Sequence, residues 1–249
     1  MTTTIFTNAR LVDPEGSEVR DGTLTVVDGR IAGLSDKMPD IATGAEIIDC
    51  AGHHLAPGIV DIGVKVSEPG ERHKESFSSA GRAAAAGGVT TIVTRPDTLP
   101  AIDTPEVLEF VARRAAEDCA VNVLPIAALT KGREGREMTE IGFLRDAGAV
   151  AFSDCDNVIT DTKIASRAFT YARSLGALVI CHVQEPGLSA GAAVTSGKFA
   201  SLKGLPGVSP MAERMALDRD IALIEMTGVR YHADQITTAR ALPALERAK

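Results

Sequence analysis

Residues 83–98 are Ala-Ala-Ala-Ala-Gly-Gly-Val-Thr-Thr-Ile-Val-Thr-Arg-Pro-Asp-Thr. The alanine run favours a helix, and the two glycines that follow are typical of the point where a helix ends and the chain turns. The apolar, β-branched run at 90–94 indicates a buried strand, which the Pro-containing turn then ends. We interpret Gly87-Gly88 as a close helix-to-strand junction, because the motifs of a phosphate-binding loop do not surround it.

The same alternation continues on both sides of this junction. Near-continuous apolar strands that alternate with amphipathic helices predict a parallel sheet covered by helices. A closed (β/α)8 barrel has eight such units, so the sequence predicts an incomplete α/β barrel of six units over residues 56–249. The expected strands are 59–66, 90–94, 121–127, 149–152, 178–182 and 229–233, and the expected helices are 76–86, 105–117, 137–146, 162–175, 212–227 and 238–248.

Residues 1–55 follow a different pattern, with short strand-like segments at 4–11, 23–27, 30–34 and 46–49. Turn residues separate these segments, and Asp28-Gly29 between two apolar runs is a strong hairpin signal. The sequence therefore predicts a small β-sandwich portion before the barrel units.

Composition excludes several classes of function. The formal charge of the 249 residues is −7 and no basic stripe is present, which argues against nucleic-acid and anionic-membrane partners. No apolar run is long enough for a membrane span, and the first residues lack the features of a signal peptide. The four cysteines form no CxxC pair, so we expect reduced thiols and a cytoplasmic protein.

Several stretches, in this order along the chain, resemble the motifs of dihydroorotases and related cyclic amidohydrolases. They are Pro57-Gly58-Ile59-Val60-Asp61, Glu68-Pro69-Gly70, Ala83 to Thr91, Arg95-Pro96-Asp97-Thr98, Ala128-Leu129-Thr130-Lys131-Gly132, Ala151-Phe152-Ser153-Asp154, Leu205-Pro206-Gly207 and Thr237-Thr238-Ala239-Arg240. The resemblance implies a barrel of the metal-dependent-hydrolase type, flanked by a sandwich built from both ends of the chain.

The resemblance also implies where a site would lie, and the chain departs from it there. Enzymes of the family bind zinc through His-x-His on the first strand, where this chain has Gly63-Val64-Lys65. An ammonium group has no lone pair to give a metal. Ser67 stands where the family has the arginine that binds the substrate carboxylate, and Asp97 stands where it has an asparagine. These substrate-binding positions are therefore degenerate.

Two of the five ligand positions that the chain covers are retained, Asp154 on the fourth strand and His182 on the fifth. The sixth-strand histidine corresponds to Gln235, and the last family ligand lies on an eighth strand. Because a catalytic zinc normally has three protein ligands, we expect no metal, no other cofactor and no catalytic residue. We expect the Lys65 ammonium to pair with Asp154, or alternatively to extend into solvent.

Other polar residues have a functional and a plain interpretation, and we favour the plain one. Asp154 and His182 could hold a single metal ion or remain as hydrogen-bonded polar groups at strand ends. Asp154 to Asp156 could carry out acid–base chemistry, or they could form a polar loop. His53, His54 and His73 could form a metal cluster, or they could be exposed to solvent. Lys131 could be catalytic, or it could be a solvated lysine at the end of a loop.

The resemblance, together with the altered ligand positions, predicts a non-catalytic dihydroorotase homologue. In some bacteria such a chain forms a complex with aspartate transcarbamoylase, so we expect that enzyme as the partner. A homo-oligomer is a further expected assembly. The alternatives are an active zinc-dependent cyclic amidase, which would hydrolyse dihydroorotate to N-carbamoyl-L-aspartate, and a protein that binds a small molecule in the barrel mouth. We expect that the native protein continues beyond Lys249, since a barrel two units short leaves open strand edges.

Overall fold

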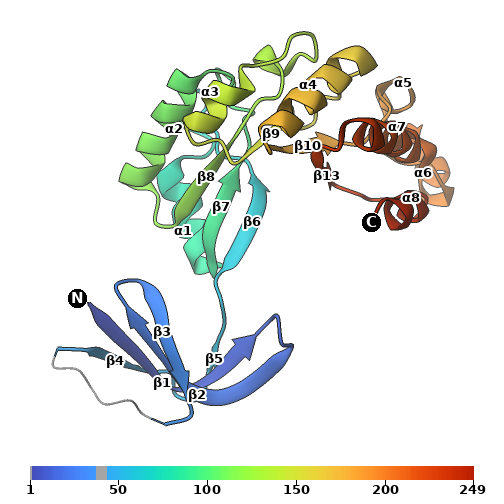
Figure 1. Cartoon of the computed structure of the whole chain (residues 1–249). Helices are drawn as coiled ribbons and strands as arrows, with labels where there is room; N and C mark the ends of the chain where they lie inside the picture. The colour runs from blue at the N-terminus through green and yellow to red at the C-terminus, as the bar shows by residue number, and fades with distance from the viewer. Residues whose placement is uncertain (1, 38–43) are drawn as a thin grey trace. The chain divides into compact units, whose positions relative to one another are not determined.

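The computed structural model describes residues 2–37 and 44–249. It divides into two compact units, Met1–Ile59 and Val60–Lys249, which are called the β unit and the barrel unit below (Figure 1).

The β unit is one sheet with the strand order β3-β2-β1-β4, in which the short strand β5 also pairs with β1. Asp28 and Gly29 have φ angles of 48° and 75° and join the paired residues Val27 and Arg30. Two positive φ angles are what a tight hairpin requires, so the hairpin prediction is confirmed. The strands are β1 (Thr3–Asp13), β2 (Glu18–Val27), β3 (Arg30–Ser35), β4 (Glu46–Asp49) and β5 (His54–Leu55).

The barrel unit contains a six-stranded sheet in the order β13-β10-β9-β8-β7-β6. Each βα unit adds its strand beside the preceding one, and the pairs from β7 to β13 are parallel. The predicted α/β half-barrel of six units is therefore confirmed. Its strands are β6 (Ile59–Val64), β7 (Val89–Thr94), β8 (Asn122–Ala127), β9 (Ala151–Ser153), β10 (Leu178–His182) and β13 (Arg230–Asp234).

Helices cover one face of this sheet, as Figure 1 shows for α2, α3 and α4. Ser76 caps the first helix, because its hydroxyl accepts a hydrogen bond from the backbone of Ser79. The helices are α1 (Phe77–Ala86), α2 (Pro105–Asp118), α3 (Ile141–Asp146), α4 (Thr162–Ser174), α7 (Met211–Thr227) and α8 (Leu242–Ala248), with a 3-10 turn at Lys131–Arg133. Within the described residues, none of the helices has both the length and the apolar character needed to cross a membrane.

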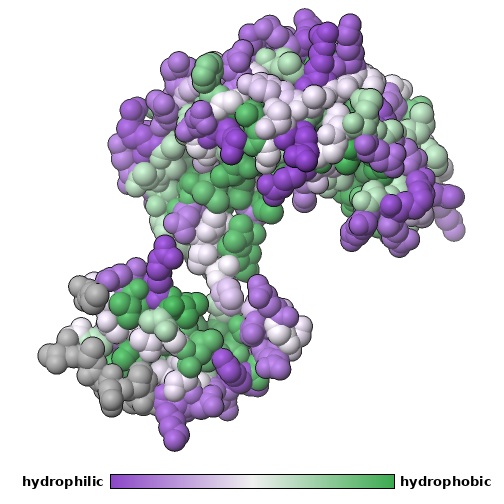
Figure 2. Space-filling view, viewed as in Figure 1, coloured by the Kyte–Doolittle hydropathy of each residue, from purple (hydrophilic) through white to green (hydrophobic). Residues whose placement is uncertain are grey.

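Alternate residues of the central strands are buried in two different clusters. On β7, Ile92 lies in the main core on the helix side, whereas its neighbour Val93 lies in a smaller cluster with Ile126 and Ile180. Successive side chains of a strand point to opposite faces, so this second cluster marks the concave face of the half-barrel. Strands β6 and β8 also carry exposed apolar residues, and Figure 2 shows hydrophobic surface on the barrel unit. They are Val60, Ile62 and Leu124.

Two helices are shorter than predicted, and one region was missed. The helix expected at 137–146 begins at Ile141, because an isolated bridge between Thr130 and Met138 keeps the preceding residues extended. The helix expected at 238–248 begins at Leu242. Between β10 and α7 the chain forms four short elements with no predicted counterpart, α5 (Pro186–Ser189), β11 (Val194–Thr195), α6 (Lys198–Lys203) and β12 (Gly207–Val208).

Candidate functional site

The carboxyl ends of the six strands form a polar region that is called the mouth below. A hollow of about 500 Å³ at the mouth is lined by Arg95, Asp156, His182 and Gln235, among others. A smaller hollow of about 170 Å³ extends along the concave face, and Gly63, Arg95 and Gln235 help to line it. The structure thus brings together residues from β6, β7, β9, β10 and β13 that the sequence had singled out.

A chain of ion pairs crosses the mouth. The Lys65 ammonium lies 3.0 Å from the Asp97 carboxylate, and Arg95 Nε lies 3.7 Å from the same oxygen. Arg95 Nη2 donates to Asp156 Oδ1 at 2.8 Å. The Asp97 side chain is only 5% exposed and that of Arg95 only 13%, so both charges depend on their partners.

These contacts set the protonation behaviour of two groups. Burial acts to lower the pKa of Arg95, but its bond to Asp156 and the charge of Asp97 outweigh burial and raise that pKa. Burial likewise acts to raise the pKa of Asp156, and the Arg95 guanidinium reverses this and lowers it. Both groups are therefore charged at neutral pH, and neither is suited to acid–base catalysis there.

The predicted ion pair between Lys65 and Asp154 is wrong. The Asp154 carboxylate accepts backbone hydrogen bonds from Leu129 at 3.0 Å and Thr130 at 2.9 Å, and also a bond from the Thr130 hydroxyl. Burial raises the pKa of Asp154, and these donors oppose the rise. With three donors already present the carboxylate has no need of Lys65, which pairs with Asp97 instead.

The other retained position, His182, is also bonded within the chain. Its Nε2 lies 2.8 Å from Gln184 Oε1, while its Nδ1 is buried and has no partner among the described residues. Ser67, at the position predicted to be a degenerate substrate contact, is buried. Sequence patterns gave no sign of the Gln184 contact.

The mouth does not fit a zinc site of the family type. Gly63 offers no side chain, the Lys65 ammonium is paired with Asp97, and Asp154 already accepts three hydrogen bonds. Across residues 2–37 and 44–249, no three His, Cys, Asp or Glu side chains come close enough together to hold a metal ion. Because a catalytic zinc needs about three protein ligands, we derive no metal-dependent step for these residues.

Glu213 on α7 is an important mouth residue that the sequence did not reveal. Its carboxylate, buried in the fold, accepts four hydrogen bonds of 2.7–2.9 Å from the backbone and hydroxyl groups of Thr237 and Thr238. These bonds fix the loop that follows β13 and carries Gln235. The paired threonines were a visible signal, but their partner lies 24 residues away.

The remaining candidates are exposed side chains and a glycine turn. His53, His54 and His73 are exposed, and Lys131 is exposed and paired with Glu137. Gly88 has a φ of 77° at the turn from α1 to β7, in agreement with a helix-to-strand junction.

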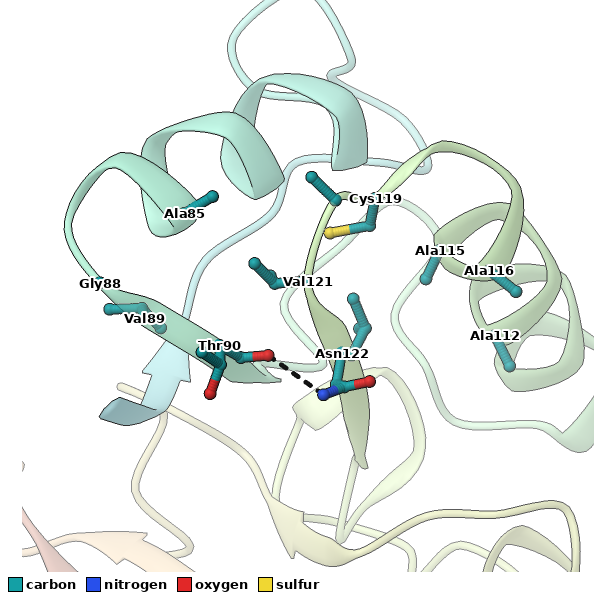
Figure 3. Close-up of a pocket in the computed structure, with 12 residues that line it drawn as sticks. Ala85, Gly88, Val89, Thr90, Ala112, Ala115, Ala116, Cys119, Val121 and Asn122 are labelled. Atoms are coloured by element: carbon teal, nitrogen blue, oxygen red, sulfur yellow. Dashed lines mark hydrogen bonds between the residues drawn. The ribbon is translucent and has the colours of Figure 1, made fainter. Parts of the chain in front are cut away.

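A further hollow of about 680 Å³ lies near the amino ends of β7 and β8, far along these strands from the mouth. Figure 3 shows that small side chains from α1 and α2 surround it, while Asn122 donates to the Thr90 carbonyl at 3.2 Å. Its lining offers no acid–base pair, and this end of such a barrel usually contributes stability. We therefore place the candidate site at the mouth.

Comparison with known proteins gives a consistent result. The family model described as "Dihydro-orotase-like" matches residues 52–241. The chain is 38% identical over 242 residues to the dihydroorotase of Solibacter usitatus (strain Ellin6076), covering 97% of this chain and 56% of that protein. It is 39% identical to a dihydroorotase-like protein of Pseudomonas putida, covering 97% of this chain and 57% of that protein.

Among solved structures, an L-hydantoinase (dihydropyrimidinase) from Arthrobacter aurescens superposes with a TM-score of 0.82 at 20% identity. The match covers 100% of this chain and 56% of the hydantoinase, and it establishes the likeness of the fold. The chain thus spans little more than half the length of the relatives it matches.

Replacement of Lys65 should reveal the ion pair at the mouth. In Lys65→Met, the buried Asp97 carboxylate loses its nearest cation, so we expect the free energy of unfolding to fall by about 1 kcal/mol. The matched control is Lys131→Met, since the two lysine side chains are 54% and 51% exposed but the partner of Lys131 is itself exposed. Urea unfolding measures the stability of both variants. Equal unfolding midpoints for Lys65→Met and Lys131→Met would contradict a stabilising ion pair between Lys65 and Asp97.

Low pH should remove the contribution of Glu213. Burial acts to raise the pKa of Glu213, but the bonds from Thr237 and Thr238 outweigh it and lower that pKa. A carboxylate with a lowered folded-state pKa stabilises the fold above its unfolded pKa, and this stability is lost as the pH falls through the folded value. We expect Glu213→Gln to cost about 2 kcal/mol at neutral pH, and the cost to shrink below about pH 4.5.

The control for that titration is Glu225→Gln, at an exposed position of the same helix. Its free energy of unfolding should follow that of the unmodified protein at every pH. If the loss of unfolding free energy in Glu213→Gln were the same at neutral and acidic pH, the charge of the Glu213 carboxylate would not contribute to stability.

Proposed function

Because the chain belongs to the dihydro-orotase-like family, we propose that it is a non-catalytic member that serves as a structural partner of aspartate transcarbamoylase in pyrimidine biosynthesis. The observation that carries this proposal is the ion pair of 3.0 Å between Lys65 and Asp97. The resemblance predicts a metal ligand at the position of Lys65, so a cation of the chain that is already paired there supports the proposal.

The chemistry of hydrolysis supports the absence of catalysis. Attack on a cyclic amide at neutral pH requires an activated water, which a bound zinc supplies by lowering the pKa of that water. Two carboxylates of the mouth are poorly suited to replace this function, because Asp156 is paired with Arg95 and Asp154 already accepts three hydrogen bonds. A chain that keeps its fold without this chemistry fits a role in assembly.

Exposed apolar side chains support a protein partner. The segment from α5 to α7 exposes large apolar residues in each of its helices, and such surfaces often mark protein–protein contacts. These residues are Leu188, Phe199, Leu202, Leu205, Met211 and Met215. We infer that this surface contacts aspartate transcarbamoylase, with a homo-oligomer as the competing assembly.

The identity of the relatives favours one alternative function. Because the matched proteins include dihydroorotases, the chain could be an active zinc-dependent cyclic amidase that converts dihydroorotate to N-carbamoyl-L-aspartate. Zinc content distinguishes this alternative from the proposal, since the alternative requires a bound ion.

After dialysis against trace zinc, we expect the purified chain to retain no stoichiometric zinc and to hydrolyse no dihydroorotate. The matched variant is Gly63→His with Lys65→His, which supplies two imidazoles and should raise the zinc content measured by elemental analysis. Because Gly63 has a φ of 93°, which strains any side chain, the unfolding midpoint of the variant is measured beside its zinc content. One tightly held zinc per unmodified chain, or turnover above background, contradicts the non-catalytic assignment.

Mixed with aspartate transcarbamoylase from the same organism, the chain should co-elute with it during size-exclusion chromatography. Leu202→Glu should weaken this complex, because it places a charge on the apolar surface of α6. Leu242→Glu, at an exposed leucine of α8, should leave it intact. Separate elution of the two unmodified proteins would remove the proposed partner, and elution of the chain alone as an oligomer would favour self-association.

A further inference from the structure

The carboxylate of Asp234 distinguishes the smaller hollow of the mouth. Asp234 ends β13, is half-buried and lines this hollow of about 170 Å³. It lies opposite His182 in the sheet, two residues beyond the pair that His232 forms with Ile180 of the concave cluster. Since side chains two residues apart on a strand share a face, Asp234 points to the concave side. Across residues 2–37 and 44–249, its side chain has neither a hydrogen-bond donor nor an ion-pair partner.

Arg95 lines the same hollow, but other carboxylates already hold its charge. Its Nη2 donates to Asp156 Oδ1 at 2.8 Å, and its Nε lies 3.7 Å from Asp97 Oδ2. The second cation of this group, Lys65, lies 3.0 Å from the same Asp97 oxygen. These two cations are therefore balanced by two carboxylates, and Asp234 is a third carboxylate beside them.

The remaining charges of the mouth make it more negative. Glu213 lines the larger hollow, and its four donors are uncharged groups that leave its charge in place. Asp154 is likewise held by uncharged donors, and Arg133 donates at 3.4 Å to its backbone carbonyl. With neutral histidines, three cations thus face five carboxylates, and a concave surface of one sign concentrates ions of the opposite sign. The cations are Lys65, Arg95 and Arg133, and the carboxylates are Asp97, Asp154, Asp156, Glu213 and Asp234.

The smaller hollow adds an apolar requirement. Ile62, Ile126 and Ile180 contribute its apolar wall, and the last two are buried in the fold. Since a water molecule occupies about 30 Å³ of liquid, a volume of about 170 Å³ holds about five atoms of that size. A ligand of this hollow is therefore small, carries a positive charge at one end and is aliphatic over the rest of its length.

We propose that the smaller hollow binds a short primary alkylammonium ion, whose ammonium group pairs with Asp234 and whose alkyl chain lies against Ile62, Ile126 and Ile180. This binding function goes beyond the proposed role in assembly and does not depend on it. An ammonium group donates three hydrogen bonds and needs only acceptors, so it does not require the set of three ligands that a zinc ion needs. The uncompensated carboxylate selects for positive charge, and the isoleucine wall selects for an alkyl chain.

Isothermal titration of the whole chain with butylammonium chloride, at fixed ionic strength, tests the proposal. We expect saturable binding that is about tenfold tighter than that of methylammonium, since three additional methylenes leave water. It should also be about tenfold tighter than that of butan-1-ol, which lacks the charge. Butanoate has the same alkyl chain length with the opposite charge and should show no saturable binding. Equal affinity for butylammonium and butan-1-ol, or for butylammonium and butanoate, would overturn the proposal.

One variant removes the charge and another the apolar wall. Asp234→Asn should weaken butylammonium binding about tenfold without lowering the urea unfolding midpoint, because the carboxylate has no partner among the described residues. Its matched control is Asp146→Asn, which removes the same charge at an exposed position of α3 and should leave the affinity unchanged.

Ile62→Asn acts on the alkyl chain, and because this side chain is 59% exposed the fold should tolerate the change. It should weaken the binding of butylammonium several-fold and leave that of methylammonium as it was. Ile31→Asn, at an isoleucine of the β unit that is 69% exposed, is the matched control and should change neither affinity. Unchanged butylammonium binding by Asp234→Asn, or equal losses for both ammonium ions in Ile62→Asn, contradicts the proposed site.

Discussion

Parallel pairing of the strands imposes the constraint on which the mouth depends. Because β7, β8, β9, β10 and β13 run in one direction, their carboxyl ends meet at one edge, and the residues that follow them share a small volume. Both faces of the central strands are apolar, as Ile92 and Val93 show. Charges excluded from the strands therefore gather where the strands end, and there they are partly removed from water.

Two different solutions stabilise the carboxylates placed in that volume. Asp154 is held by backbone and hydroxyl donors of the loop after β8, which need no countercharge. Asp97 is balanced instead by the cations of Lys65 and Arg95, and its Oδ1 has no hydrogen-bond partner among the described residues. An unpaired buried charge costs several kcal/mol, so the presence of Asp97 makes a nearby cation a structural necessity.

Strands and turns that depend on neighbouring residues were predicted correctly from the sequence. Contacts between residues that lie far apart in the chain were not predicted. Strand 90–94 and the Asp28-Gly29 hairpin follow from side-chain pattern and turn chemistry within a few residues. The elements between β10 and α7 were missed because segments of two to six residues are too short to show a period. The partner of Lys65 depended on whether Asp154 had other donors, and these donors lie 24 and 25 residues before it.

In a metal enzyme the bound ion also links the strands that supply its ligands. In this chain, side chains make the equivalent links: Lys65 with Asp97 joins β6 to β7, and Arg95 with Asp156 joins the ends of β7 and β9. Asp154 joins the loops after β8 and β9, while Glu213 holds the loop after β13 to α7.

A metal ion entering between these groups would have to displace bonds that already satisfy buried charges. Loss of the Lys65 pair, for example, would leave the buried Asp97 carboxylate with only the more distant Arg95, and weakening a buried charge pair costs more than the bond itself contributes. The pairing of the groups present at the mouth would therefore oppose a metal by itself, which is a separate effect from the predicted loss of ligand positions.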